Sequence, residues 1–160
     1  MGEIFSVNIS SRKGTSKSPI EKAYIAKDFG VKGDAHFGFS HRQVSLLSWE
    51  DIEEQNCYIK EGKFDIKELK PGDFAENITT RGIDLSCLKI GDKIKMGREV
   101  VLEVTQIGKK CHDLCEISKK IGKCIMPKQG IFARVLRGGW VRKGDPIFVV
   151  KDENRHNNGK

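Results

Sequence analysis

The chain has 160 residues, of which 38% are hydrophobic and 32% are charged, and it carries a formal net charge of +7. This length predicts one globular domain with a real hydrophobic core, and no apolar run is long enough to span a bilayer. The positive charge predicts attraction to an anionic partner, such as a phosphate-bearing cofactor, nucleic acid or an acidic protein.

The cysteine content indicates a reducing compartment. Five cysteines, an odd number, occur in a chain whose N-terminal sequence lacks the basic-then-apolar order of a signal peptide. We therefore expect reduced thiols in a cytoplasmic protein without membrane association, not a disulfide framework. We also expect residues 1–150 to form a single domain and residues 151–160 to be a polar, disordered tail.

The first part of the chain predicts short strands separated by a turn-rich loop. Residues 2–9 alternate between apolar and polar side chains and predict a first strand, and residues 20–26 predict a second. A glycine-rich loop follows, and His36 and His41 flank it.

A buried strand and a helix are predicted next. Residues 44–47 have the apolar character of a short buried strand, and residues 48–51 form a Ser-x-x-Asp capping box. Together they predict a helix from about residue 49 to residue 58. We expect Tyr58 to face the core and Cys57 to be a small core residue.

Residues 62–98 break into short segments bounded by glycine turns, which predicts an all-β, barrel-like core. An apolar-x-x-Gly-Asp-x-Ile frame occurs at residues 88–94 and again at residues 141–147. Each copy predicts a tight turn that leads into a strand. Cys87, next to the first copy, is expected to be buried.

The strongest strand pattern covers residues 98–107, where alternation gives one wholly apolar face. Residues 130–136 fit a strand or a helix, because this apolar run is too short to decide. Residues 147–150 predict a last strand. The expected fold class is therefore mostly β with a few short helices, as a closed or partly open β-barrel.

A basic cluster of thiols follows the strongest strand at once. It contains Cys111, Cys115 and Cys124, with His112 beside the first and several lysines around them. Neighbouring cations favour the thiolate, and a helix over residues 112–120 would further stabilise a negative sulfur at its N-terminus. Cys111 is thus the leading candidate for a reactive or metal-ligating sulfur, and Cys124 is its competitor.

Other uses of the cluster stay open. A zinc or iron–sulfur site is less favoured because the chain has no Cys-x-x-Cys pair. A disulfide between Cys111 and Cys115 would span one helical turn and would be regulatory. A papain-type nucleophile needs a histidine base, for which His36 and His41 are candidates through the fold.

Nucleic acid is the less favoured partner. Small basic β-barrels that bind it carry aromatic residues interleaved with Lys and Arg on their strands. In this chain the aromatic residues are mostly single phenylalanines in apolar contexts, such as Phe132 and Phe148, which we expect in the core.

Four motifs, in this order and spacing, resemble the MOSC domain, a module found at the C-terminus of molybdenum-cofactor sulfurases and as stand-alone bacterial proteins. The resemblance covers about residues 2–150. The motifs are Gly-Asp-Ala-His-x-Gly (33–38) with Arg-Gln-Val-Ser-Leu-Leu (42–47), Phe-Ala-Glu-Asn-Ile-Thr-Thr (74–80), Leu-Glu-Val-Thr-Gln-Ile-Gly-Lys-Lys-Cys (102–111), and Gly-Ile-Phe-Ala-Arg-Val-Leu (130–136) with the glycines at 138, 139 and 144.

The resemblance implies a barrel related to the second domain of pyruvate kinase and an association with the molybdenum cofactor (molybdopterin) or with sulfur bound for it. By motif, Cys111 matches a cysteine that in relatives ligates molybdenum or is proposed to carry sulfur as a persulfide. The cofactor-binding residues that the resemblance implies are Arg42, Asn77, Thr79, Lys109 and Arg134. A soft thiolate suits molybdenum, and the anionic cofactor suits a basic cleft.

The first functional hypothesis is a protein that binds this cofactor or its precursor in a basic cleft around Cys111 and acts in cofactor sulfuration, handling or delivery. Its partners would be the cofactor or the proteins that make and accept it. One alternative is a molybdenum-dependent reductase of N-hydroxylated compounds. Another is a basic β-barrel binding module without catalysis.

Overall fold

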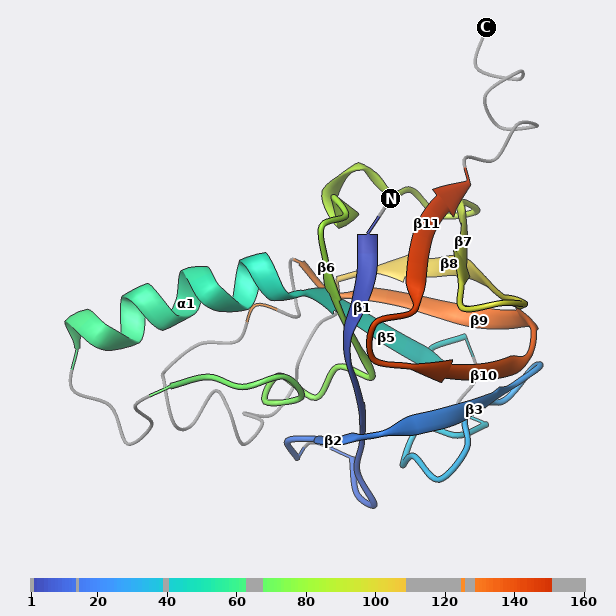
Figure 1. Cartoon of the computed structure of the whole chain (residues 1–160), viewed down its shortest axis with the longest axis horizontal. Helices are drawn as coiled ribbons and strands as arrows, with labels where there is room; N and C mark the ends of the chain where they lie inside the picture. The colour runs from blue at the N-terminus through green and yellow to red at the C-terminus, as the bar shows by residue number, and fades with distance from the viewer. Residues whose placement is uncertain are drawn as a thin grey trace, which may run out of the picture.

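The computed structural model describes residues 2–13, 15–38, 41–62, 68–108, 125 and 129–150. Within these ranges the chain forms mainly β-strands, with one α-helix beside them (Figure 1). The strands are β1 (Gly2–Ile9), β2 (Ser18–Ile20), β3 (Lys22–Ala26), β4 (Gly30–Val31), β5 (Val44–Ser48), β6 (Ile78–Arg81), β7 (Lys93–Met96), β8 (Val100–Ile107), β9 (Ile131–Arg137), β10 (Gly139–Arg142) and β11 (Pro146–Val150). The helices are α1 (Trp49–Glu61) and the short 3-10 helix η1 (Leu85–Cys87).

Pairing between the first and the last strand closes a barrel. In the described part of the chain, seven strands follow one another around it in the order β1-β11-β7-β8-β9-β5-β6 and back to β1. Only β5 and β6 in this ring are parallel, because α1 connects them as a crossover. β10, β3 and β4 form a second, smaller sheet. The expected mostly-β barrel is confirmed.

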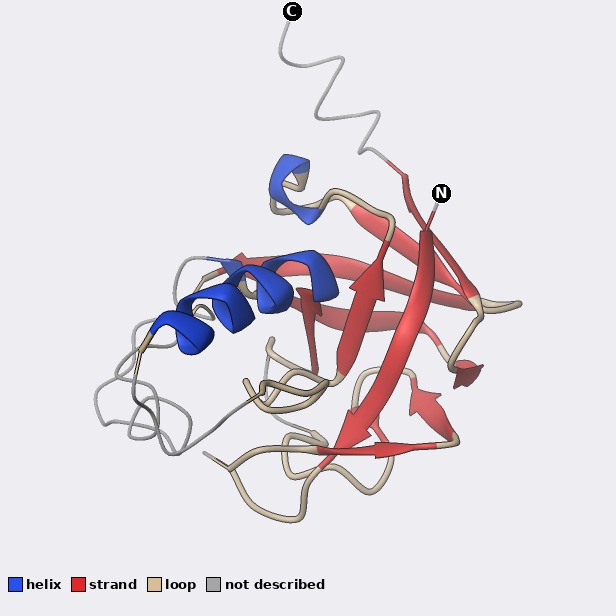
Figure 2. Ribbon diagram, turned by 60° about the vertical axis from the view of Figure 1, so that its left-hand side comes forward, coloured by secondary structure: helices blue, strands red, loops and turns tan. Residues whose placement is uncertain are grey.

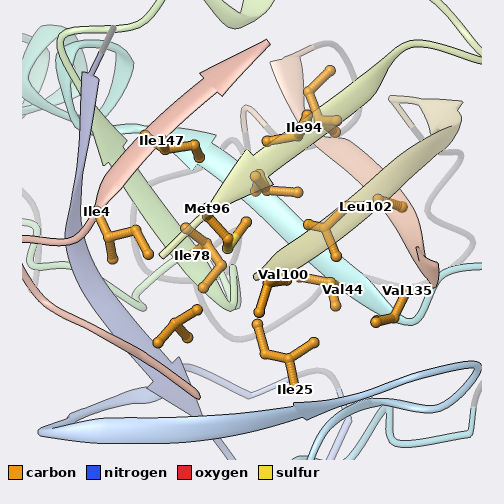
Figure 3. Packing of buried hydrophobic residues seen from close by; sticks show 14 of the residues in the cluster. Ile4, Ile25, Val44, Ile78, Ile94, Met96, Val100, Leu102, Val135 and Ile147 are labelled. Carbon is orange, nitrogen blue, oxygen red and sulfur yellow. The ribbon is translucent and has the colours of Figure 1, made fainter. Parts of the chain in front are cut away.

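Alternation along the strands fills the barrel with aliphatic side chains. On β8, Val100, Leu102 and Val104 are buried in this interior, as the sequence pattern predicts. Figure 3 shows side chains from most strands converging there; its labelled residues are Ile4, Ile25, Val44, Ile78, Ile94, Met96, Val100, Leu102, Val135 and Ile147. Each buried aliphatic side chain contributes about 1.5–3 kcal/mol, so this interior is the main source of stability.

A second hydrophobic cluster lies outside the barrel, under α1. On β5, Leu46 points into the interior, whereas Leu47 joins Ile52 of α1 and Phe132 of β9 on the outer side. Figure 2 shows α1 lying along the outside of the strands. The helix and the residues that pack with it therefore cover part of the outer face of β5 and β9, around Leu47 and Phe132.

The capping box starts α1 as predicted. The Ser48 hydroxyl accepts a hydrogen bond from the backbone N–H of Asp51 at 3.1 Å, and the helix continues to Glu61. The predicted burial of Cys57 and Tyr58 is wrong, since both are exposed. The helix turns Ile52 and Ile59 toward the barrel, and the helical period then leaves Cys57 and Tyr58 on the solvent side.

Several other expectations needed correction. The single strand expected over residues 20–26 is two strands, because β2 pairs with β1 while β3 pairs with β10 and β4. Residues 130–136 proved to be a strand. Cys87 is exposed at the end of η1, not buried. Phe148 is also 37% exposed, because its neighbour in β11 takes the inward position.

The repeated Gly-Asp frame is a turn in both places, as predicted. Gly91 and Gly144 have φ angles of +97° and +93°, which favour glycine. The carboxylates of Asp92 and Asp145 accept backbone N–H groups three residues earlier, at 2.9 and 3.0 Å. The predicted helix over residues 112–120 and the predicted tail lie outside the described residues.

Candidate functional site

The residues that the sequence singles out are found in three kinds of place. Lys109 and Cys111 lie outside the described residues, as do Cys115 and Cys124. Arg42 and Arg134 lie on the outer face of the barrel. Asn77 and Thr79 are buried in its wall.

The end of β8 is held by two hydrogen bonds at Gly108. The backbone N–H of Gly108 donates to the carbonyl oxygen of Gly130 at 2.7 Å. The side-chain amide nitrogen of Gln106 donates to the Gly108 carbonyl oxygen at 2.7 Å. These two bonds define the position of Gly108, which precedes Cys111 by three residues in the sequence.

His41 lies at this same point. Its Nε2 is 2.7 Å from the side-chain oxygen of Gln106, and the hydroxyl of Thr105 donates to its backbone carbonyl. The amide oxygen can only accept, so the Nε2 of His41 carries the hydrogen and donates it. Sequence reasoning left His36 and His41 equivalent; the structure brings only His41 to the end of β8.

The two predicted arginines share the outer face of β9. The guanidinium carbon of Arg42 lies 5.9 Å from the centroid of the Phe132 ring. Arg134 follows Phe132 by one strand period, so it lies on the same face, where its Nε donates to Glu103 at 2.8 Å. The cation–π contact holds Arg42 against the barrel wall, and the ion pair holds Arg134 across the β8–β9 pair.

Asn77 and Thr79 belong to a buried hydrogen-bond network that joins three strands. The Asn77 side-chain oxygen accepts from the Ser45 backbone N–H at 3.0 Å, and its nitrogen donates to the Asn8 carbonyl at 3.2 Å. The Thr79 hydroxyl accepts from the Asn8 side chain at 3.0 Å. These contacts tie β1 and β5 to the start of β6. Cofactor contact by Asn77 or Thr79 stays a prediction.

Glu76 is a residue that sequence reasoning did not select. It is fully buried, and its Oε2 accepts from the Gly72 backbone N–H at 2.9 Å and from the Thr79 hydroxyl at 2.6 Å. Its Oε1 has no hydrogen-bond partner among the described residues. Burial raises the pKa of Glu76 to about 7, although its hydrogen bonds oppose that rise. The glutamate is part of a quoted motif, but nothing local in the sequence indicates its burial.

His36 belongs to a different cluster. Its backbone N–H donates to Asp34 at 3.0 Å, and Asp34 forms a buried ion pair with Lys17 at 2.7 Å. Burial alone would raise the pKa of Asp34, but the hydrogen bonds from His36 and Lys17 and the charge of Lys17 hold it well below its usual range. The Gly-Asp-Ala-His motif thus fixes the loop after β4 to the loop after β1.

A cleft of about 520 Å³ opens at the end of the barrel, next to Ile107 and Ile131. It is lined by three carboxylates, Glu50, Asp51 and Asp84. Burial raises the pKa of Asp51, and the charges of the neighbouring carboxylates raise it further against the hydrogen bond from Ser48. The lining of this cleft is therefore acidic.

Among the residues that the structure describes, no group of three or more His, Cys, Asp or Glu side chains is arranged to hold a metal ion. The metal ligand that the sequence predicts, Cys111, is outside these residues. No helix in the described ranges has the length and apolar character needed to cross a membrane.

Comparison with known proteins gives a family and a fold. A family model described as the MOSC domain matches residues 32–148. No curated protein matches significantly. The YuaD protein from Bacillus subtilis has a similar structure, with a TM-score of 0.77 and 21% identity over 94% of this chain and 96% of that chain.

Two YiiM structures are also similar. The protein from Escherichia coli has a TM-score of 0.68 and 18% identity over 95% of this chain and 71% of that one. The protein from Geobacillus stearothermophilus has a TM-score of 0.66 and 21% identity over 94% of this chain and 76% of that one. At these identities the structures bear on the fold alone. Because the family model spans the barrel from the Gly-Asp-Ala-His motif to β11, the chain belongs to the MOSC domain family, which is associated with the molybdenum cofactor.

Proposed function

We propose that the protein binds the molybdenum cofactor or its precursor on the outer face of the barrel, where β8 ends, and that Cys111 either ligates it or carries sulfur to it. The observation behind the proposal is the Gly108 junction, where Gln106 links His41 to the start of the thiol-bearing sequence. Cys111 follows Gly108 by three residues, so covalent geometry keeps the two Cα atoms within about 11 Å.

The described side chains near this junction fit an anionic, phosphate-bearing ligand. Arg42 is laid against Phe132, so it loses less conformational freedom on binding than a solvated arginine does. Glu103 accepts a hydrogen bond from the Nε–H of Arg134 only. Among the described residues, the two terminal nitrogens of Arg134 donate no hydrogen bond. A guanidinium can bind a phosphate through two parallel hydrogen bonds.

The cofactor, when bound, supplies a molybdenum centre that accepts soft sulfur ligands. The protein contributes the thiol and the groups that control its proton. Gln106 holds the Nε2–H of His41 at this junction. The two lysines that immediately precede Cys111 favour its thiolate, the form that ligates metal or attacks sulfur.

In the sulfur-carrier role, the Cys111 thiolate attacks the outer sulfur of a donor persulfide. A new S–S bond forms at Cys111 while the S–S bond of the donor breaks, and the donor leaves as a thiolate. This exchange needs no external oxidant. The ligand role and the carrier role use the same thiol and differ in whether sulfur leaves it again.

The test is the molybdenum, pterin and persulfide content of protein made in a host that produces the cofactor. We expect Cys111→Ser to lose cofactor or persulfide, and Arg42→Gln and Arg134→Gln to lower cofactor content. Cys57→Ser and Cys87→Ser are the controls, because both thiols are exposed and neither belongs to the thiol-bearing sequence after β8.

Wild-type protein that never carries molybdenum, pterin or persulfide sulfur would contradict the proposal. Loss of function in Cys124→Ser but not in Cys111→Ser would move the site. Turnover of an N-hydroxylated amine by cofactor-loaded protein would favour the reductase alternative over a carrier.

A further inference from the structure

The small sheet presents a surface that the proposed function does not use. In the β3–β10 pair, Tyr24 lies opposite Trp140 and Lys22 lies opposite Arg142. All four side chains are exposed, while the residues that alternate with them are buried. Aromatic and basic side chains therefore alternate across one outward face of two strands. Figure 1 shows β3 and β10 on the side of the barrel away from the C-terminal end of α1.

Trp140 is the centre of this surface. It is 57% exposed, and the Tyr24 ring meets it edge to face with centroids 5.4 Å apart. The Lys22 ammonium lies 5.1 Å from the centroid of the indole ring. A tryptophan that is more than half exposed and flanked by a cation is a ready platform for a planar, anionic ligand.

A cleft of about 680 Å³ runs beside the indole ring, and three cations line it. The lining residues are Lys22, Arg98, Glu99, Trp140, Arg142 and Asp145. Both carboxylates are already engaged, Glu99 with Arg137 at 3.7 Å and Asp145 with the Arg142 backbone N–H at 3.0 Å. The side chains of Lys22, Arg98 and Arg142 form no ion pair within the described ranges. With three cations against two carboxylates, the lining carries a net positive charge, which favours an anionic ligand.

The β7–β8 turn packs directly on β10 at one side of the cleft. A Cβ at Gly97 would lie 3.2 Å from the Trp140 carbonyl oxygen, and a Cβ at Gly139 would lie 2.7 Å from a side-chain carbon of Glu99. Glycine at both positions lets the turn approach the strand. This close packing places the backbone of Arg98 beside β10.

We propose that this surface, defined by Lys22, Tyr24, Arg98, Trp140 and Arg142, binds single-stranded nucleic acid. An unpaired base stacks on Trp140, and the cations hold the phosphates on either side of it. A duplex keeps its bases stacked on one another and cannot offer one to the indole ring. Each strand carries a short aromatic–basic alternation, Lys-Ala-Tyr at residues 22–24 and Trp-Val-Arg at residues 140–142, and the pairing of β3 with β10 brings the two together on one face.

The first measurement uses the full chain, a labelled ten-nucleotide oligo(U) or oligo(dT), and fluorescence anisotropy at low salt. We expect binding to quench tryptophan fluorescence, and the logarithm of affinity to fall with the logarithm of salt with a slope of about −2 for three cations. The chain has two tryptophans. Trp49 is stacked on Phe5 with centroids 4.8 Å apart, so Trp140→Phe should remove most of the quenching.

Variants separate stacking from charge. Trp140→Ala should weaken oligonucleotide binding about 5- to 150-fold, the range for losing one stacked base. Trp140→Phe should retain part of the affinity. Arg98→Gln and Arg142→Gln should each reduce the salt slope by about 0.7. Tyr58→Ala and Lys60→Gln on α1 are the controls, because they remove another exposed aromatic residue and one positive charge elsewhere.

Three results would overturn the proposal: equal affinity for a duplex of the same length, equal affinity for free uridine monophosphate, or an equal loss of binding in the α1 control variants. Circular dichroism must show that Trp140→Ala is folded. The same variant should keep its molybdenum and pterin content, which makes failure here distinguishable from failure of the proposed function.

Discussion

The hydroxyl of Thr79 donates a 2.6 Å hydrogen bond to a carboxyl oxygen of Glu76, and both side chains are fully buried. Because burial raises the pKa of Glu76 from 4.5 to about 7, the folded protein binds a proton there between these pH values that the unfolded chain releases. This contribution to the free energy of unfolding is therefore fully present below about pH 4.5 and is lost as pH rises through 7.

We predict that Glu76→Gln flattens this pH dependence. The wild type should lose on the order of 3 kcal/mol of stability between pH 5 and pH 8 from this group, and the amide variant should not. Urea unfolding at several pH values measures the difference. Parallel plots of the free energy of unfolding against pH for the two proteins would show that Glu76 does not titrate in this range.

Thr79 and Thr80, two consecutive buried threonines of β6, give a paired test of hydrogen bonding in the barrel wall. We expect Thr79→Val to cost about 1–3 kcal/mol, because it removes one donor to Glu76 and one acceptor for Asn8. Thr80 is equally buried, but its hydroxyl has no hydrogen-bond partner among the described residues, so Thr80→Val should be neutral or stabilising. Equal losses in urea unfolding would contradict this assignment.

The buried Lys17–Asp34 pair predicts a large effect from a small change. Asp34→Asn leaves the Lys17 ammonium buried without a counter-charge, which should cost about 3–5 kcal/mol. Because the pKa of Asp34 is lowered, its contribution is present above its ordinary pKa and is lost only in stronger acid.

The matched control for this pair is Glu3→Gln. It breaks an ion pair with Arg81 in which both side chains are largely exposed, and it should cost no more than about 1 kcal/mol. Thermal unfolding at neutral pH would compare the two variants. A similar small loss in both would mean that the ammonium of Lys17 reaches water in the variant.

Two glycines separate backbone strain from steric clash. Gly72 and Gly144 have φ angles of +92° and +93°, so alanine costs about 1–2 kcal/mol at either position. A Cβ at Gly72 would lie 2.1 Å from the Lys17 carbonyl oxygen, whereas a Cβ at Gly144 meets nothing within 4 Å. Gly72→Ala should therefore be clearly more destabilising than Gly144→Ala, and equal melting temperatures would refute this.

Thiol labelling tests which cysteine is activated. Because Cys57 and Cys87 are exposed, accessibility alone does not separate them from the thiols after β8. We expect brief alkylation of native protein at about pH 6 to label Cys111 first, since the lysines around it in the sequence favour its thiolate. Mass spectrometry of the digested protein identifies the site, and first labelling of Cys57 or Cys87 would count against Cys111.

Local patterns in the sequence predicted the features that depend on local physics. Alternation over residues 98–107 and the capping box at residues 48–51 both led to correct elements, because side-chain period and backbone capping act within one element. The repeated Gly-Asp frame was correct for the same reason. Burial of single residues failed at Cys57, Cys87 and Phe148, since it depends on which face another element covers.

The arrangement of the candidate site depended on contacts between distant residues. Gln106 is an unremarked strand residue in the sequence, yet its side chain joins His41 to Gly108. The buried carboxyl of Glu76 and the pairing of Tyr24 with Trp140 likewise arise only when the barrel forms. Motifs marked the region of the site, whereas tertiary pairing decided which groups within it meet.

The closure of the barrel by β1 and β11 has a consequence for synthesis. Gly2 of β1 pairs with Ile147 of β11, so the barrel cannot close until β11 has been synthesised. Until β11 leaves the ribosome, one edge of β7 and the start of β1, at Gly2 and Glu3, keep unpaired backbone groups that can join another chain. A nascent or truncated chain that stops after β10 is therefore the form most exposed to aggregation, and contacts this distant in sequence favour slow folding.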